Sequence, residues 1–297
     1  MSSWIWMKGV DVAIADPIDP VVPEDGRPAV KDLILEHREQ IVKIKAELGT
    51  DPLYNASKHD DLWILRYWLS HKNTKDALAA AAHTLKFRQD FDLDTKDIRD
   101  IPPRRLREGP VADYWQKRWR GDALVCVVPD KHRGAMMFID FTGSDPSASK
   151  MKEEIWLESY VYCSEWTHQW LDYITRTTGR FTKSIRFIDF SGVSLTKHID
   201  RVSNIRDSKI MNYMEDCYPQ LLATMFICGT PSWIHLLWAV FRPLLPQRLI
   251  DKIDVVHPER NEKERARILK HISMEDLPLK YGGENQVAPK DWTGIEL

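Results

Sequence analysis

Apolar positions recur at helical spacing in the first third of the chain. Between residues 29 and 48 they return every three or four positions among charged residues, and Gly49 ends the pattern. A second helical pattern begins at the acidic pair of residues 60 and 61, and an alanine-rich one runs from Lys75 to Asp90. The sequence therefore predicts a helix over residues 29–48 and a small all-helical module over residues 29–100.

Beyond this module the pattern changes to short apolar runs separated by long helical patterns. Four runs bounded by Gly or Pro are typical of buried strands, at residues 123–128, 135–141, 184–190 and 221–227. Helical patterns lie between them over residues 150–178 and 198–218. This alternation predicts an α/β fold with a mostly parallel sheet covered by helices.

Proline-rich segments mark the limits of the domains. Residues 1–28 carry several prolines and aspartates and are typical of a mobile arm, although two tryptophans give that arm groups that can dock. Three prolines in residues 101–110 cannot continue a helix, so they separate the helical module from a second domain over residues 105–284. We expect residues 285–297 to form a tail.

Charge and cysteine usage narrow the class of protein. Lys and Arg total 42 against 44 for Asp and Glu, so the net charge of -2 provides no global attraction to nucleic acid. The four cysteines form no CxxC pair and lie in apolar stretches, which favours reduced thiols and a cytoplasmic location. The longest apolar-rich tract, Leu221 to Leu245, is interrupted by Gly, Pro, His and Arg, so it does not predict a membrane span. We expect a cytoplasmic monomer that associates only transiently with membranes.

The chain lacks the common catalytic sequence patterns. It contains no GxGxxG, GxxxxGK[ST], GxSxG or HExxH. Asp140 and Asp189, near the ends of two predicted strands, are the candidates for acid–base chemistry. Hydrogen bonding to the turn that follows, such as Ser191-Gly192, is the simpler role for such a carboxylate. We therefore expect no catalytic residue and no metal site.

Four segments follow one another in a characteristic order in the second domain. They read SIRFIDFSGVSLTKHI from Ser184, YMEDCYPQLLATMFICGTP from Tyr213, WAVFRPLLPQRLIDKI from Trp238 and MEDLPLKYGG from Met274. With the helical run that ends at Phe87-Arg88, they resemble the CRAL-TRIO lipid-binding family, which includes the yeast phosphatidylinositol/phosphatidylcholine transfer protein. The resemblance covers residues 57–283 and implies a CRAL-TRIO domain with an apolar lipid pocket on one face of the sheet, closed by a mobile helix.

The segment WIHLLWAVFRPLL, residues 233–245, corresponds to that closing helix, which we call the gate helix. It is apolar on more than one side, so it needs two apolar partners, such as the protein core and an acyl chain or a membrane. An ordinary buried helix is the alternative. The expected gate residues are Trp233, Leu236, Leu237, Val240 and Phe241.

The resemblance also implies a headgroup site, formed by Ser184, Arg186, Gln220 and Lys252. Family members that bind phosphatidylinositol carry Glu at the position of Gln220 and Lys at that of Lys252. A neutral Gln leaves Lys252 less well anchored, which weakens the inference of an inositol headgroup.

Arg186 stands where the resemblance leads us to expect Thr. An arginine that faces an apolar pocket is costly unless it is paired, and a phosphodiester is a good bidentate partner. We therefore expect Arg186 to bind an anionic headgroup. The alternative is an ion pair with Glu158 or Glu165 of the covering helix.

Strand alternation and the resemblance supply the remaining pocket residues. Ile188 and Phe190 share the face of Arg186, and Met225 and Ile227 come from the next strand. Phe138 takes the place nearest to the tyrosines that surround choline in relatives, so exchange of phosphatidylcholine is in doubt.

The sequence thus predicts a non-enzymatic protein that carries a single lipid, phosphatidylinositol or another phospholipid, between membranes. Such a protein would support phosphoinositide metabolism or membrane trafficking, and would need no cofactor besides its lipid. Three alternatives remain. They are a carrier of a tocopherol, a retinoid or haem, a scaffold that recruits partners through the Trp-bearing arm, and an enzyme that uses Asp140 or Asp189.

Overall fold

The chain forms two compact units. The computed structural model describes residues 26–95, 124–127, 136–140, 152–191, 201–214, 216–245, 247–275 and 277–286. Unit 1 comprises Met1–Arg99, Ser164–Lys183 and Tyr213–Leu221, and unit 2 comprises Asp100–Cys163, Ser184–Asn212 and Leu222–Leu297. Unit 1 therefore contains the predicted helical module and also two segments from later in the chain.

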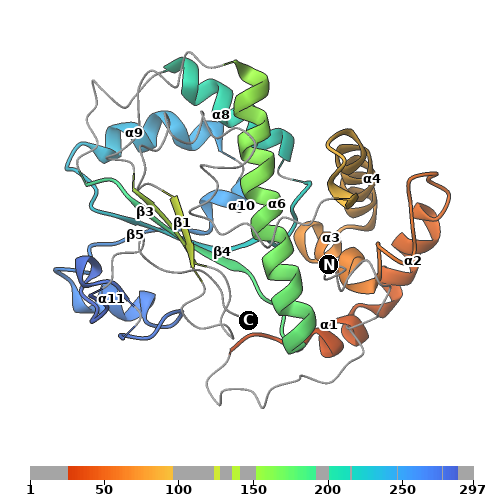
Figure 1. Cartoon of the computed structure of the whole chain (residues 1–297), viewed down its shortest axis with the longest axis horizontal. Coiled ribbons are helices and arrows are strands. Elements are labelled where there is room, and N and C mark those ends of the chain that lie inside the picture. Colours follow the sequence, from red (N-terminus) through yellow and green to blue (C-terminus); the bar gives the residue numbers. More distant parts are fainter. Residues whose placement is uncertain are drawn as a thin grey trace. The chain divides into compact units, whose positions relative to one another are not determined.

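Unit 1 begins with four short helices (Figure 1). They are α1 (Val30–Glu36), α2 (Arg38–Leu48), α3 (Asp61–His71) and α4 (Thr74–Asp90), followed by the 3-10 turn η3 (Leu93–Thr95). The side chain of Asp60 accepts a hydrogen bond from Trp63 N (3.0 Å) and that of Asn73 from Lys75 N (2.9 Å), so both helices start at side-chain caps. The single helix expected over residues 29–48 is wrong, because His37 (φ -110°, ψ 19°) separates two helices.

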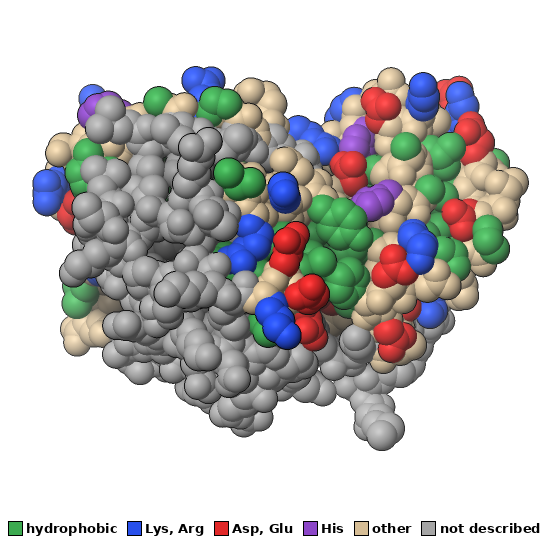
Figure 2. All heavy atoms as spheres, turned by 90° about the horizontal axis from the view of Figure 1, so that it is seen from above, with side chains coloured by type: hydrophobic (Ala, Val, Ile, Leu, Met, Phe, Trp, Pro, Cys, Tyr) green, Lys and Arg blue, Asp and Glu red, His purple; other side chains and the backbone are tan. Residues whose placement is uncertain are grey.

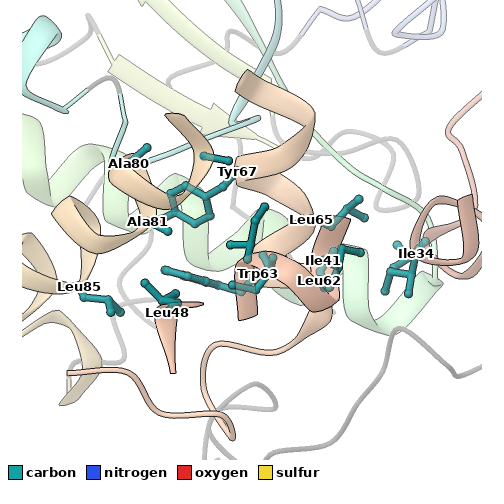
Figure 3. Packing of buried hydrophobic residues seen from close by; sticks show 14 of the residues in the cluster. Ile34, Ile41, Leu48, Leu62, Trp63, Leu65, Tyr67, Ala80, Ala81 and Leu85 are labelled. Carbon is teal, nitrogen blue, oxygen red and sulfur yellow. The ribbon is translucent and has the colours of Figure 1, made fainter. Parts of the chain in front are cut away.

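A hydrophobic core joins these four helices. Figure 3 shows side chains from each of them meeting between the helices, with the ring of Trp63 near the centre of the view. Ile44, Leu62, Ile64 and Ala81 are fully buried. Burial of this apolar face supplies most of the stability that such short helices lack on their own.

Within unit 1, buried ion pairs connect α3 and α4 to the part of the long helix α6 (Glu153–Thr178) that begins at Ser164. Asp172 accepts hydrogen bonds from Arg176 Nε (2.6 Å) and Arg66 Nη2 (3.4 Å), and Arg176 also bonds to Asp60. Burial opposes ionisation of Asp172, but the two arginines outweigh it and lower its pKa to about 2. The carboxylate is therefore ionised in the folded protein over the usual pH range.

Unit 2 contains a five-stranded sheet in the order β1-β2-β3-β4-β5. The strands are β1 (Leu124–Val127), β2 (Met136–Asp140), β3 (Ser184–Asp189), β4 (Leu222–Cys228) and β5 (Ile253–Val255). β1 pairs with β2 antiparallel and the other pairs are parallel. The predicted α/β class and mostly parallel sheet are confirmed, and β5 is an additional strand.

Helices of unit 2 lie on both sides of the sheet (Figure 1). They are α8 (Arg201–Met214), α9 (Ile234–Phe241), the turn η7 (Arg242–Leu244), α10 (Gln247–Ile250), α11 (Glu262–Ile268) and the turn η8 (Leu279–Tyr281). α8 and α9 lie above the sheet in this view and α11 lies below it. α8 ends four residues earlier than expected, and a turn follows in which Cys217 N donates to Met214 O (3.0 Å).

Several sequence predictions lie outside the described residues. These are most of the arm over residues 1–28, the boundary segment 101–110 and the tail beyond residue 286. None of the described helices is both long and apolar enough to cross a bilayer. Figure 2 shows acidic and basic side chains interspersed among the described residues of the face that it draws.

Candidate lipid-binding site

The central strand β3 presents different chemistry to its two sides. Ile185 and Phe187 are buried beside β4 and the C-terminal elements, and the ring of Phe187 stacks on that of Tyr281 at 5.9 Å. This side forms a closed core. Its buried members are Ile185, Phe187, Phe226, Cys228, Val256, Ile268, Ile272, Leu277 and Tyr281.

The opposite side of the sheet is more open. Met225 and Ile227 of β4 are each 8% exposed, and half-buried apolar side chains pack around them. We call this surface the Arg186 face, and define it by Arg186, Ile188, Phe190, Met225, Ile227, Leu249 and Ile253. Four of its apolar side chains are only half-buried, so this face has apolar area still available for a ligand.

Arg186 is the charged member of this face. It pairs in register with Met225 of β4 and Met137 of β2, both apolar residues. The side chain is half-buried, and its Nε is buried without a hydrogen-bond partner in the described part of the chain. A buried guanidinium nitrogen without an acceptor is costly, so this position favours an anionic ligand.

Neither of the two expected acids pairs with Arg186 among the described residues. Glu165 accepts hydrogen bonds from both terminal nitrogens of Arg88, at 3.1 and 3.2 Å, and from Gln169 at 2.7 Å. Glu158 is exposed. An ion pair of Arg186 with either acid, the alternative to an anionic ligand, therefore has no support in the described residues.

Ser184 lies at the start of β3, on the alternation of Arg186, and is fully buried. The register between β3 and β4 shifts here, because Ser184 pairs with Leu222 while Ile185 pairs with Thr224. The extra residue is Ala223 of β4, so the bulge lies in β4 opposite the start of β3. Strand alternation places Ser184 on the same side of the sheet as Arg186.

Lys252 and Gln220 fall in different units, so no pairing between them is described. The carbonyl of Lys252 accepts hydrogen bonds from Met225 N (2.8 Å) and Thr224 Oγ1 (3.2 Å), which fixes Lys252 beside β4. Its side chain is half-buried. Gln220 has a left-handed backbone (φ 61°), and its amide nitrogen donates to Ser70 Oγ (3.1 Å) within unit 1.

The predicted gate segment forms helix α9, continued by η7. None of its described side chains is buried: Trp233, Ile234 and Trp238 are half-buried, and His235 and Ala239 are exposed. The side chains of Leu236, Leu237, Val240 and Phe241 lie outside the described residues. The described positions of this segment therefore do not form the fully buried helix that was the alternative to a gate helix.

The backbone register bears on Phe138, whose side chain is not described. Phe138 pairs with Phe187, and it is Met137 that pairs with Arg186. The side chain of Phe138 is not described, so its expected place beside the headgroup stays a prediction.

Asp189 has the simpler of the two roles considered for it. Its Oδ1 accepts hydrogen bonds from the backbone nitrogen of Ser191 (2.7 Å) and from the Ser191 hydroxyl, as expected for a turn after the strand. Tyr281 and Lys280 contact Oδ2. Asp189 is 1% exposed and fully engaged, so it is a structural acceptor. Asp140 pairs with it in register, and the side chain of Asp140 is not described.

The described residues show no other sign of catalytic or metal chemistry. No group of three His, Cys, Asp or Glu residues within them is arranged to bind a metal ion. Cys217 and Cys228 are buried free thiols, and burial raises the pKa of Cys217 to about 12. Thiols with raised pKa values are poor nucleophiles.

Two residues of the Arg186 face were missed in the sequence, Leu249 of α10 and Ile253 of β5. Both belong to elements of three or four residues, which are too short to produce a periodic pattern. The signal available was their place on either side of Lys252 in the run LIDKI.

The site is thus a half-open apolar sheet face that carries a half-buried arginine, a site type suited to an amphipathic ligand. The family model for the CRAL/TRIO domain matches residues 121–283. The chain belongs to the CRAL/TRIO domain family. Members of this family bind or transfer lipids and are generally not enzymes.

Two relatives from Arabidopsis thaliana are similar in sequence to this chain. Patellin-4 of Arabidopsis thaliana is 33% identical over 75 residues, which cover 25% of this chain and 13% of patellin-4. The phosphatidylinositol/phosphatidylcholine transfer protein SFH7 of the same species is 25% identical over 234 residues, or 76% of this chain and 40% of SFH7. The chain therefore spans less than half the length of either relative.

A solved structure is also similar. The crystal structure of Sfh5 aligns with a TM-score of 0.47 and 12% sequence identity, covering 77% of this chain and 80% of that chain.

Proposed function

We propose that this protein binds one phospholipid and transfers it between membranes. The acyl chains lie against the apolar residues of the Arg186 face, and the phosphate is bound by Arg186. The observation that carries the proposal is the Nε of Arg186, which is buried on an apolar, half-open face and has no partner among the residues that the structure describes. A guanidinium matches the oxygens of a phosphate and offers several donors in a fixed plane.

Ser184 and Lys252 are the further headgroup residues in this proposal. Both lie in unit 2 with Arg186, and a hydroxyl and an ammonium add donors for the same phosphate or for the group attached to it. Gln220 is bonded to Ser70 and has a smaller part. Phosphatidylinositol or another anionic phospholipid is therefore the preferred ligand, in line with the name of the relative SFH7.

Lipid transfer requires only that the acyl chains exchange the apolar interior of the bilayer for the apolar face of the protein. Burial of acyl chains on the protein offsets the burial lost from the bilayer, so no nucleotide or cofactor is needed. Helix α9, in which Trp238 is half-buried, is the element that opens at the membrane surface. In this proposal the protein is a cytoplasmic monomer that contacts membranes transiently.

Arg186→Gln tests the proposal. We expect the variant to bind anionic phospholipid in vesicles at least about tenfold more weakly, because the ligand phosphate loses its charged partner. Binding is measured by loading from vesicles of phosphatidylcholine containing phosphatidylinositol or phosphatidic acid. Arg260→Gln is the matched control, since the Arg260 side chain is 83% exposed.

Equal loading of the Arg186→Gln variant, the control and the unmodified protein would overturn the role of Arg186. Failure of the unmodified protein to load any phospholipid, with uptake of haem, a retinoid or a tocopherol instead, would replace the proposed ligand class.

A further inference from the structure

A buried carboxylate connects the end of β3 to the C-terminal part of unit 2. Asp189 is the last residue of β3 and is 1% exposed. Oδ1 accepts from the backbone and side chain of Ser191, and Oδ2 accepts from the Tyr281 hydroxyl (3.3 Å) and contacts Lys280 Nζ in an ion pair. A carboxylate this deeply buried is stable only while such partners are present.

The partners of Oδ2 come from residues 277–286, which we call the C-terminal clamp. Its backbone closes on itself, because Asn285 N donates to Leu277 O (3.0 Å) and Leu279 N donates to Asn285 O (3.0 Å). A Cβ at Gly283 would lie 1.9 Å from Leu277 O, so the loop requires glycine there. The clamp is therefore a preformed loop that presents Lys280 and Tyr281 together.

These two residues differ in how they are attached. Tyr281 is 6% exposed and stacks on Phe187, so it belongs to the closed core. The Lys280 side chain is 50% exposed and reaches the buried carboxylate from the surface. Lys280 is the cation of the Asp189 cluster that solvent and other molecules can reach.

The same carboxylate also lies against the end of β4. Gly229 follows β4 with φ +61°, and a Cβ there would lie 2.7 Å from Asp189 Oδ1 and 2.9 Å from Ser191 Cβ. Phe190 N donates to Cys228 O (2.9 Å) at this point. Asp189 therefore joins the ends of β3 and β4 to the C-terminal clamp.

β3 and β4 carry most of the Arg186 face on their other side. Ile188 precedes Asp189 in the chain, Phe190 follows it, and Ile227 precedes Cys228. The Asp189 contacts are therefore one residue of backbone away from three members of the candidate lipid site.

We propose that the Asp189–Lys280 ion pair is a releasable latch, which fixes the C-terminal clamp on the strand ends and slows release of lipid from the Arg186 face. Neutralisation of Lys280 by substitution removes the cation and leaves Asp189 buried without it. The clamp then opens more often. The effect on lipid rests on the proposed function, whereas the latch itself does not.

Hydrogen–deuterium exchange of the full chain tests the latch. We expect Lys280→Met to increase exchange in peptides covering residues 277–286 by about tenfold, because local opening costs less free energy without the ion pair. Lys270→Met is the matched control, since Lys270 is an exposed lysine with no ion pair to Asp189, and should leave these peptides unchanged. Equal protection in all three proteins would overturn the latch.

A double-mutant cycle separates the ion pair from a general loss of packing. We expect Lys280→Met to add little to Asp189→Asn, because the two substitutions remove the same interaction. Independent, additive increases in exchange would contradict the pairing. Should Asp189→Asn fail to fold, Lys280→Arg replaces the cycle, because it keeps the cation beside Asp189. Exchange should then stay near that of the unmodified protein, and an increase as large as that of Lys280→Met would contradict the pairing.

Lipid release is measured on the same variants with a fluorescent anionic phospholipid. We expect the dissociation rate from Lys280→Met to rise several-fold while the preference among headgroups stays that of the unmodified protein. A clamp that opens with no change in release would overturn the link to lipid. Failure of every protein to load lipid would count against the proposed function, and the exchange experiment would still decide the latch.

Discussion

His59 is a buried histidine whose surroundings accept only its neutral form. The ring is 2% exposed and lies 4.6 Å from the ring of Trp63. Asn55 N donates a hydrogen bond to His59 Nδ1 (3.0 Å), so this nitrogen carries a lone pair and the proton is on Nε2. Burial lowers the pKa of His59 to about 4 from its usual 6.5.

This pKa shift predicts a loss of stability in mild acid. Between pH 6.5 and 4 the unfolded chain binds a proton at His59 that the folded chain does not, so the free energy of unfolding is highest above pH 6.5 and falls as the pH decreases through this window. The loss reaches up to about 3 kcal/mol. Urea denaturation at pH 7.5 and pH 5.0 measures it.

His59→Gln should reduce this pH dependence, because Gln does not titrate, while the exposed His235→Gln should retain it. An unchanged difference between the two pH values in His59→Gln would show that other groups are responsible.

Strand alternation allowed the two faces of β3 to be predicted from the residues alone. It placed Arg186 with Ile188 and Phe190 on one face and Ile185 with Phe187 on the other, and the observed clusters agree. The contact of Asp189 with Lys280 was not predictable in this way, because the two residues are 91 positions apart and no local pattern links them.

Among the elements, helices that have a capping residue or a long run of periodic apolar positions were predicted best. Asp60 and Asn73 cap α3 and α4 close to where the sequence indicates. The break at His37 and the three-residue strand β5 were missed, because neither has a Gly, a Pro or a periodic pattern to mark it.

Helix α9 gives the prediction at this scale. Trp238 is half-buried, so Trp238→Ser should change the melting temperature little and should slow lipid exchange with vesicles several-fold, because it weakens apolar contact with the membrane. Vesicle-to-vesicle transfer and thermal unfolding measure the two effects. By contrast, Trp63→Ser removes a core side chain that is 8% exposed and should lower the melting temperature strongly. Unchanged lipid transfer by Trp238→Ser would contradict the role of α9 in membrane contact.

The whole molecule is divided differently from the boundaries expected from composition. Composition separates residues 29–100 from residues 105–284, whereas unit 1 also takes in Ser164–Lys183 and Tyr213–Leu221. The reason is physical: the buried pairs Arg66–Asp172 and Arg88–Glu165 connect the N-terminal helices to the second half of α6. Partners so far apart in the chain leave no signal in local composition.

The central claim is that the chain carries one anionic phospholipid. Native mass spectrometry of the protein purified from a eukaryotic host, followed by extraction and identification of what is released, tests it most directly. The account predicts one phosphate-bearing lipid per chain, with lower occupancy in Arg186→Gln and full occupancy in Arg260→Gln. A neutral isoprenoid, a haem, or an empty protein that also fails to load from anionic vesicles would contradict it.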